Sequence, residues 1–96
     1  MLAKVVQVKP NHDFTVHVYF YDGKVKLFDV KPYLNQGVFQ KISDLDVFLE
    51  KCTVMNGTLA WDIAGGFNEF ECIDIDPETI YQTGKDVADP LVKSIA

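Results

Sequence analysis

Two dipeptides, Asp22-Gly23 and Asn56-Gly57, constrain the fold of this chain more than any other feature of its sequence. Each stands between two runs in which apolar and polar residues alternate, the pattern of strands with one buried face. An acid or amide followed by glycine accepts the positive φ angles of a type I′ turn, which joins neighbouring antiparallel strands. The sequence therefore predicts two β-hairpins, with strands at 14–20 and 24–30 and at 52–55 and 58–62.

Another alternating run, at residues 3–9, precedes the first hairpin. The link at 10–13 consists of Pro, Asn, His and Asp, which favour turns. Pro32 ends the third strand because proline cannot donate to a ladder, and residues 33–37 then form a turn. The first thirty residues are therefore expected to form a three-stranded antiparallel meander.

A helix is predicted at residues 44–51, between the two hairpins. Ser43 precedes it, and its hydroxyl can cap the helix by accepting a hydrogen bond from an amide of the first turn. Leu45, Phe48 and Leu49 follow the i, i+3, i+4 spacing of a helix with one buried side. This helix is expected to cover one face of the sheet.

The last third of the chain predicts a strand at 72–75 that directs its isoleucines to one face and Asp74 to the other. A second helix is predicted at 77–82, because Asp76 is a favourable cap and proline suits the first helical position. Gly84 ends this helix. Beyond it, the sequence leaves open a last short helix from residue 91 or an irregular tail.

Together these elements predict an α+β fold: a small single domain with a mostly antiparallel sheet, made of the three-stranded meander and the second hairpin. One short helix packs on this sheet, and a short C-terminal helix follows. The domain is assigned to residues 1–85, and residues 86–96 to a tail or a short helix. Ninety-six residues with 48% hydrophobic content provide one core.

The apolar residues are distributed in short runs, none of which approaches the ~18 residues that span a bilayer. Lysine and glutamine interrupt the N-terminal segment before a signal-peptide core could form. We therefore expect no membrane association and a cytoplasmic protein. Cys52 and Cys72 lack a CxxC spacing, so two reduced thiols are favoured over a disulfide or a metal pair.

The net charge of −5 is unevenly distributed along the chain. Residues 1–43 carry six lysines against three acids, whereas residues 44–96 carry three lysines against eleven acids. All basic residues are lysine, so the guanidinium group that reads guanine edges in pairs of hydrogen bonds is absent. This composition argues against sequence-specific nucleic acid binding, and the acidic half suits a basic partner.

The segment from Trp61 to Tyr81 concentrates carboxylates, a glycine pair and aromatic residues. Two aromatics on a polar loop either fold back near Trp61 or meet a partner, because exposing them to water is unfavourable. A partner or ligand surface is therefore predicted here. Its candidate residues are Trp61, Asp62, Phe67, Phe70, Asp74, Asp76 and Tyr81.

The same acidic residues could instead bind a hard cation, because Ca²⁺ and Mg²⁺ require several converging oxygens. Asp62, Asp74 and Asp76 are the candidates, although their spacing is not that of an EF-hand loop. Neither His12 nor His17 stands beside an evident nucleophile. We expect no catalytic residues, no cofactor and no resident metal, and therefore not an enzyme.

Three features together resemble the small bacterial family catalogued as domain of unknown function 2442. They are the Phe20-Tyr21-Asp22-Gly23 turn, the segment from Gly37-Val38-Phe39 to Phe48, and Trp61-Asp62 followed by the acidic run from Ile73 to Tyr81. The resemblance covers about residues 3–81. This chain differs from the family pattern in two ways. Its loop at 63–71 is longer, and it leaves no room after residue 85 for the helix-turn-helix module that some members carry.

The resemblance implies a compact α+β domain with no established activity, often encoded beside another small protein. Such a gene context points to a regulatory or toxin–antitoxin-like pair. The leading expectation is therefore a non-enzymatic domain that binds a protein partner through the Trp61–Tyr81 surface or an exposed sheet edge. A small-ligand or cation-binding domain is the alternative, and the choice between monomer and homodimer stays open.

Overall fold

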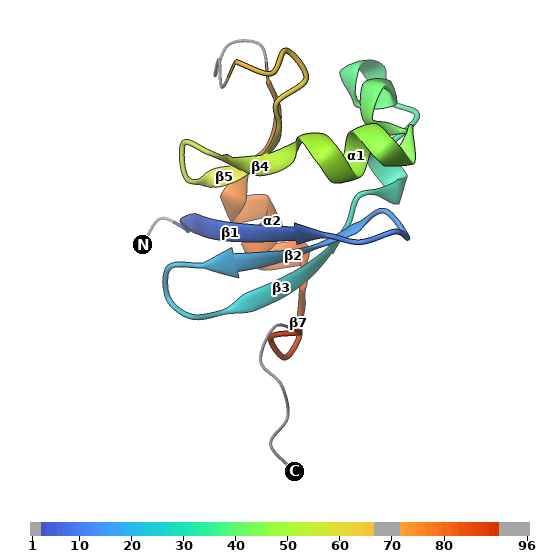
Figure 1. Cartoon of the computed structure of the whole chain (residues 1–96). Coiled ribbons are helices and arrows are strands. Elements are labelled where there is room, and N and C mark those ends of the chain that lie inside the picture. The colour runs from blue at the N-terminus through green and yellow to red at the C-terminus, as the bar shows by residue number, and fades with distance from the viewer. Residues whose placement is uncertain (1–2, 67–71, 91–96) are drawn as a thin grey trace.

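The computed structural model describes residues 3–66 and 72–90, which form two β-sheets and several short helices (Figure 1). The strands are β1 (Val5–Pro10), β2 (Thr15–Phe20), β3 (Val25–Asp29), β4 (Cys52–Met55), β5 (Thr58–Trp61), β6 (Ile73–Ile75) and β7 (Lys85–Asp86). The helices are α1 (Leu45–Lys51) and α2 (Pro77–Thr83), with 3₁₀ helices η1 (Lys31–Tyr33) and η2 (Gly37–Ile42).

The strands form a four-stranded sheet in the order β1-β2-β3-β7 and a three-stranded sheet in the order β4-β5-β6, with every neighbouring pair antiparallel. The predicted α+β class and the meander of β1, β2 and β3 are confirmed. The second hairpin starts a separate sheet, however. Figure 1 shows this hairpin and α1 above the meander, while α2 lies behind it and contacts β3.

The two predicted hairpins differ in their turns. Asn56 and Gly57 both have positive φ angles, 52° and 71°, as a type I′ turn requires. At Asp22-Gly23 only the glycine is left-handed, with φ 91°, so the predicted type I′ turn is wrong there. The Asp22 carboxylate accepts a hydrogen bond from the Lys24 amide at 3.0 Å, which stabilises a longer loop.

Phe14, expected to begin the second strand, lies just before β2 with a left-handed φ of 64°. This conformation is rare for a bulky residue. It is held by two backbone hydrogen bonds, from the Phe14 amide to the Asn11 carbonyl and from the Val30 amide to the Phe14 carbonyl. The Phe14 ring then meets that of Phe48 edge-on at 5.0 Å, which connects the meander to α1.

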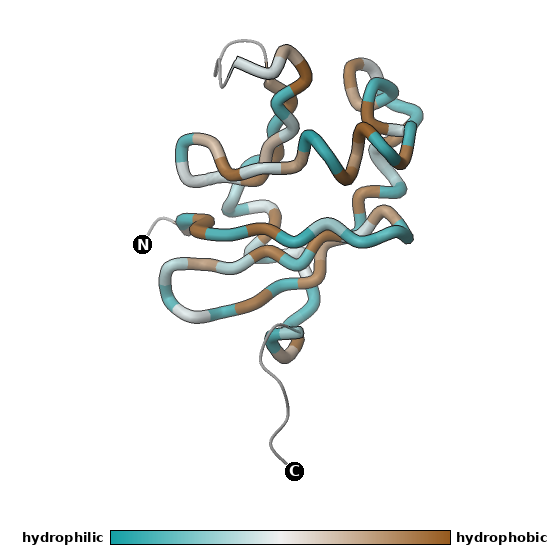
Figure 2. The backbone as a smooth tube through the Cα atoms, viewed as in Figure 1, coloured by the Kyte–Doolittle hydropathy of each residue, from teal (hydrophilic) through white to brown (hydrophobic). Residues whose placement is uncertain are grey.

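One hydrophobic core joins the two sheets and both α-helices. Figure 2 shows hydrophobic positions distributed over both sheets, α1 and the 3₁₀ segment. The largest fully buried side chains come from all of these parts and from α2. They are Trp61, Phe48, Ile42, Leu59, Ile80, Val5, Val16, Val18 and Val30.

Helix α1 occupies the predicted residues but has a different cap. The Asp44 carboxylate accepts hydrogen bonds from the amides of Asp46, at 2.9 Å, and Val47. Ser43 instead ends η2, and its hydroxyl donates back to the Gln40 carbonyl at 2.7 Å. The predicted Ser43 cap is therefore wrong, because an unforeseen 3₁₀ helix runs up to that residue and shifts the cap by one position.

The end of the chain follows the prediction as far as Gly84. Asp76 caps α2, and β6 buries its isoleucines while leaving Asp74 exposed. Beyond Gly84, β7 adds an unpredicted edge strand to β3, and Asp89 accepts a hydrogen bond from the Tyr19 hydroxyl at 2.7 Å. The helix considered from residue 91 lies outside the described residues. Within residues 3–66 and 72–90, no helix has the length and hydrophobicity needed to span a bilayer.

Candidate functional site

Trp61, the first residue of the predicted Trp61–Tyr81 surface, belongs to the core. Its side chain is fully buried, and its indole Nε1 donates a hydrogen bond to the Phe48 carbonyl at 3.1 Å. The two rings also pack against each other with centroids 5.6 Å apart. Trp61 therefore holds α1 against β5.

The three candidate aspartates of this segment lie in different parts of the fold. The buried Asp62 carboxylate accepts a hydrogen bond from the Gly65 amide at 3.2 Å, and Asp76 accepts two from Thr79 at the start of α2. Asp74 projects from the exposed face of β6. No group of three or more potential metal-ligating side chains occurs within the described ranges. Phe67 and Phe70 lie outside those ranges.

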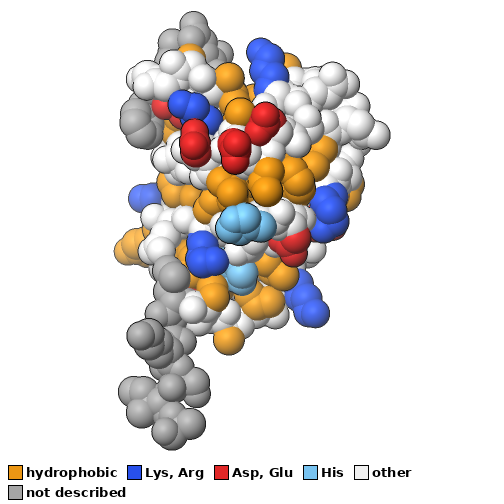
Figure 3. All heavy atoms as spheres, turned by 45° about the vertical axis from the view of Figure 1, so that its right-hand side comes forward, with side chains coloured by type: hydrophobic (Ala, Val, Ile, Leu, Met, Phe, Trp, Pro, Cys, Tyr) orange, Lys and Arg blue, Asp and Glu red, His pale blue; other side chains and the backbone are white. Residues whose placement is uncertain are grey.

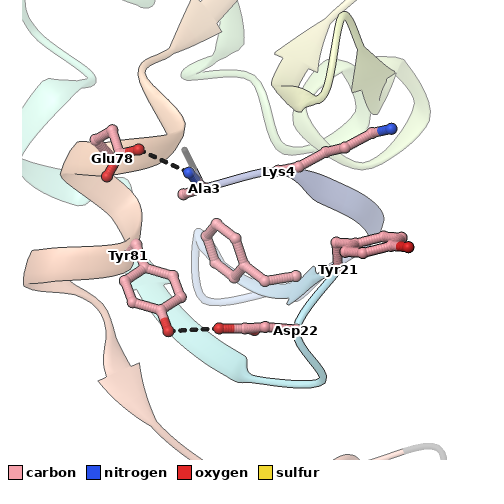
Figure 4. A pocket seen from close by; sticks show the side chains of 7 residues that line it. Ala3, Lys4, Tyr21, Asp22, Glu78 and Tyr81 are labelled. Atoms are coloured by element: carbon pink, nitrogen blue, oxygen red, sulfur yellow. Dashed lines mark hydrogen bonds between the residues drawn. The ribbon is translucent and has the colours of Figure 1, made fainter. Parts of the chain in front are cut away.

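Tyr81 lies elsewhere, at the wall of a hollow with a volume of about 290 Å³ (Figure 4). Three segments that are distant in the sequence meet there: the residues before β1, the end of β2 with its turn, and one side of α2. We call this the Tyr21 hollow. It is lined by Ala3, Lys4, Phe20, Tyr21, Asp22, Glu78 and Tyr81.

Two hydrogen bonds fix α2 against the other walls of the hollow, and both are drawn in Figure 4. Glu78 and Tyr81 are three residues apart and therefore share one side of α2. The Glu78 carboxylate accepts a hydrogen bond from the Ala3 amide at 2.6 Å. The Tyr81 hydroxyl donates to Asp22 Oδ2 at 2.5 Å. The Tyr81 ring also meets Phe20 edge-to-face at 5.0 Å.

Tyr21 is the most exposed aromatic side chain of the hollow, at 78%. Phe20 is the last residue of β2 and is buried in the core, whereas Tyr21 lies in the turn that follows and faces solvent. The Tyr21 amide donates a hydrogen bond to the Lys4 carbonyl at 2.8 Å, which ties the turn to the start of β1. Lys4 Nζ lies 5.8 Å from the centroid of the Tyr21 ring.

Carboxylates set the electrostatics of the hollow. The pKa of Tyr81 is raised because its hydroxyl donates to Asp22 and because the charges of Asp22, Asp86 and Glu78 oppose its ionisation. Conversely, the pKa of Asp22 is lowered by the bond from Tyr81 and by the Lys24 amide. At neutral pH the hollow therefore contains a protonated phenol and an ionised acid.

The Tyr81 ring also contacts a cation from the protein itself. Lys26 Nζ lies 4.9 Å from the Tyr81 ring centroid and 2.7 Å from the Asp86 carboxylate. The Lys26 side chain is 10% exposed, so its charge is held by these two partners rather than by bulk water. This contact connects the hollow to β7, which the sequence did not reveal.

A second hollow, of about 390 Å³, adjoins the first across the start of the chain. The two share Ala3, Lys4 and Glu78, and the second adds Asp76 and the Asn56-Gly57 turn. The Val5 amide donates to the Gly57 carbonyl at 2.8 Å beside it. Of the predicted site residues, the structure thus places Asp76 and Tyr81 along one connected depression.

The sequence did not single out Lys4, Phe20, Tyr21, Asp22 or Glu78 as site residues. Two signals were available: an aromatic residue next to a hairpin turn, and the i, i+3 spacing of Glu78 and Tyr81. Neither reveals that the residues before β1 lie against α2. That contact joins positions 75 residues apart, at Ala3 and Glu78.

The face shown in Figure 3 carries a band of hydrophobic side chains between carboxylates and the histidines. His17 is half-buried, and its Nδ1 lies 2.9 Å from Asn11 Nδ2. Burial lowers the pKa of His17, with Lys9 adding to the effect. Burial likewise raises the pKa of the Cys52 thiol to about 12. His17 thus takes part in a hydrogen-bonded turn, and Cys52 packs against the hydrophobic core.

Comparison with known proteins identifies a family. No curated protein and no solved structure matches the chain. The sequence model of one family, described as protein of unknown function (DUF2442), matches residues 5–86. This span runs from the first residue of β1 to the last residue of β7. The chain therefore belongs to the DUF2442 family, as its hairpin turn and its Trp-Asp and Asp-Pro segments indicated.

Proposed function

We propose that this chain is a non-enzymatic interaction domain that binds a protein partner at the Tyr21 hollow. The observation that carries the proposal is the 78% exposed Tyr21 ring beside an apolar depression walled by Phe20 and Tyr81. Tyrosine is enriched among the residues that dominate binding energy, and such residues pair with pockets. A water-exposed aromatic at a hollow is therefore suited to anchoring a partner.

The proposed surface differs from the one expected from the sequence. It keeps Tyr81 and Asp76, replaces the buried Trp61 with Tyr21, and includes the acids that line the hollow. The acidic surroundings suit a basic partner, because complementary charge accelerates encounter.

The neighbouring gene product is the proposed partner, as one half of a regulatory pair of the toxin–antitoxin type. The family resemblance, with its paired genes, motivates this choice. The proposal places both proteins in the cytoplasm, where cysteine thiols stay reduced.

The test is to mix the purified chain with that gene product and to measure complex formation by size-exclusion chromatography and calorimetry. We expect co-elution, and a dissociation constant raised at least about tenfold by Tyr21→Ala, the usual effect of losing an anchoring aromatic.

Val38→Ala is the matched control, because Val38 is 57% exposed but lines neither hollow. Its affinity should equal that of the unmodified chain. Failure to form a complex at micromolar concentrations, or a complex indifferent to Tyr21→Ala, would contradict the proposal.

A further inference from the structure

We propose that the Tyr21 hollow binds the side chain of a lysine or arginine of the partner. This inference rests on the proposed function and adds the chemistry of the occupant. A lysine or arginine side chain combines an apolar stem with a cationic end. The hollow has matching parts: aromatic rings for the stem, and ring faces and carboxylates for the charge.

The lining supplies both kinds of contact in one place. Phe20, Tyr21 and Tyr81 contribute aromatic surface, and Asp22 and Glu78 contribute carboxylates. The volume of about 290 Å³ is several times the roughly 30 Å³ that a water molecule occupies in the liquid. The hollow can therefore admit part of a side chain and not only solvent.

Ammonium groups of the chain itself already lie over aromatic rings of this hollow. Lys26 Nζ is 4.9 Å from the Tyr81 ring centroid, and Lys4 Nζ is 5.8 Å from that of Tyr21. Both distances are within the ~6 Å at which the quadrupole of a ring attracts a cation. The two tyrosines are therefore shown, by intramolecular contacts, to accept an ammonium ion.

The charged residues that line the hollow carry one net negative charge. The lining contains two acids, Asp22 and Glu78, against one base, Lys4. Lys26, which contacts the Tyr81 ring but does not line the hollow, has its charge balanced by Asp86 at 2.7 Å. The pKa of Tyr81 is raised first by its hydrogen bond to Asp22 and by burial, and the charges of Asp22, Asp86 and Glu78 add to the effect.

Both acids can accept a further hydrogen bond from an incoming cation. Asp22 already accepts from the Lys24 amide and from Tyr81, and Glu78 accepts from the Ala3 amide. An ionised carboxylate has about four acceptor positions, so these bonds do not exhaust either group. Lys4 is the charge that opposes entry, and its exposed side chain competes with the incoming cation for the Tyr21 ring.

The experiment is an NMR titration of the full chain with three capped amino acids of similar shape. Nα-acetyl-lysine methylamide and Nα-acetyl-arginine methylamide carry the charge, and Nα-acetyl-norleucine methylamide is a neutral analogue that keeps the four-carbon stem of lysine without the ammonium group. We expect saturable shifts at Tyr21 and Tyr81 with dissociation constants of about millimolar for the charged probes, and at least about tenfold weaker binding of norleucine.

Three variants refine the test. Tyr21→Leu keeps an apolar side chain but removes the aromatic face, and should weaken lysine binding about tenfold. Glu78→Gln keeps an acceptor for the Ala3 amide but removes the negative charge. This variant should bind the lysine probe several-fold more weakly. Lys4→Met should strengthen binding, because it removes the competing cation. A spectrum with unchanged dispersion confirms that each variant is folded.

Equal binding of norleucine and lysine would overturn the inference, as would the absence of shifts with either charged probe. If the partner complex depends on Tyr21 and the charged probes do not bind, the inference fails and the proposed function stands. If the lysine probe binds and no protein partner forms a complex, the proposed function fails, and with it the assignment of the cation to a partner.

Discussion

Tyr81 donates its hydroxyl hydrogen to Asp22 Oδ2 across 2.5 Å, although 59 residues separate the two in the sequence. The bond connects α2 to the turn after β2 and places the Tyr81 ring against Phe20. It therefore fixes the distance between two walls of the Tyr21 hollow. The shape of the proposed binding site depends on this pairing of a phenol with a carboxylate.

Replacing Tyr81 with phenylalanine should lower the free energy of unfolding at neutral pH more than in acid. The pKa of Asp22 is lowered in the folded chain, first by the bond from Tyr81. A lowered pKa adds stability that is fully present above the unfolded value of about 3.9 and is lost as the pH falls through the folded value. Tyr81→Phe should therefore be less stable than the unmodified chain at pH 7, with a difference that shrinks in acid.

Urea unfolding at a series of pH values measures this difference, and NMR titration of the Asp22 carboxyl should show its pKa rising in Tyr81→Phe. Tyr21→Phe is the control, because it removes an exposed hydroxyl from the same hollow. An unchanged Asp22 pKa in Tyr81→Phe would contradict the assigned role of the bond.

Adding a methyl group at Gly84 should destabilise the fold. A Cβ there would lie 2.7 Å from the Ile80 carbonyl oxygen and 2.9 Å from Lys26 Cβ, closer than real contacts allow. Gly84→Ala should lower the free energy of unfolding by about 1–3 kcal/mol, the usual effect of overpacking. Gly66→Ala is the matched control, since a Cβ at Gly66 meets no atom within 4 Å. Equal unfolding curves for the two variants would refute the close packing of α2 on β3.

The cap of α1 can be tested with two adjacent substitutions. Asp44→Ala removes the acceptor for the amides of Asp46 and Val47, and should lower the free energy of unfolding by about 1 kcal/mol. Ser43→Ala removes only a hydroxyl that donates to the Gln40 carbonyl, and should change the free energy of unfolding by less than about 0.5 kcal/mol. Thermal or urea unfolding followed by circular dichroism ranks them. The reverse order would restore Ser43 as the cap.

Cys52 should resist alkylation while the chain is folded. Burial raises the pKa of its thiol to about 12, so almost no thiolate is present at pH 8. In the unfolded chain the thiol has a pKa of about 8.5 and reacts readily. Mass spectrometry after iodoacetamide treatment, with a urea-unfolded sample as the control, should find Cys52 modified only in urea. Rapid modification in the native sample would contradict the raised pKa of this half-buried thiol.

Local rules explain the elements that could be predicted. The Asn56-Gly57 turn, the bounds of α1 and the Asp76 cap each depend on a few neighbouring residues, whose preferences are readable from the sequence. The family resemblance was likewise carried by short motifs. By contrast, the 3₁₀ helix η2 moves the α1 cap from Ser43 to Asp44, and the residues around Ser43 did not predict this helix.

Long-range packing explains what the sequence did not reveal. Lys85 and Asp86 form β7 because Lys26 and Leu27 lie beside them, and that neighbourhood exists only in the folded chain. The Tyr21 hollow arises in the same way, from the contact between Ala3 and Glu78. Trp61 was assigned to the surface because the segment it begins is rich in carboxylates and contains a glycine pair, whereas its side chain is buried and its indole donates to the carbonyl of Phe48.

The burial of Trp61 gives the chain a built-in optical reporter. It is the single tryptophan of the sequence, it lines neither hollow, and its indole is shielded from water on every side. Its emission will shift when the whole fold opens, and will stay constant when a cation enters beside Tyr21. One fluorescence spectrum can thus distinguish a variant that is unfolded from a variant that is folded but no longer binds the ligand.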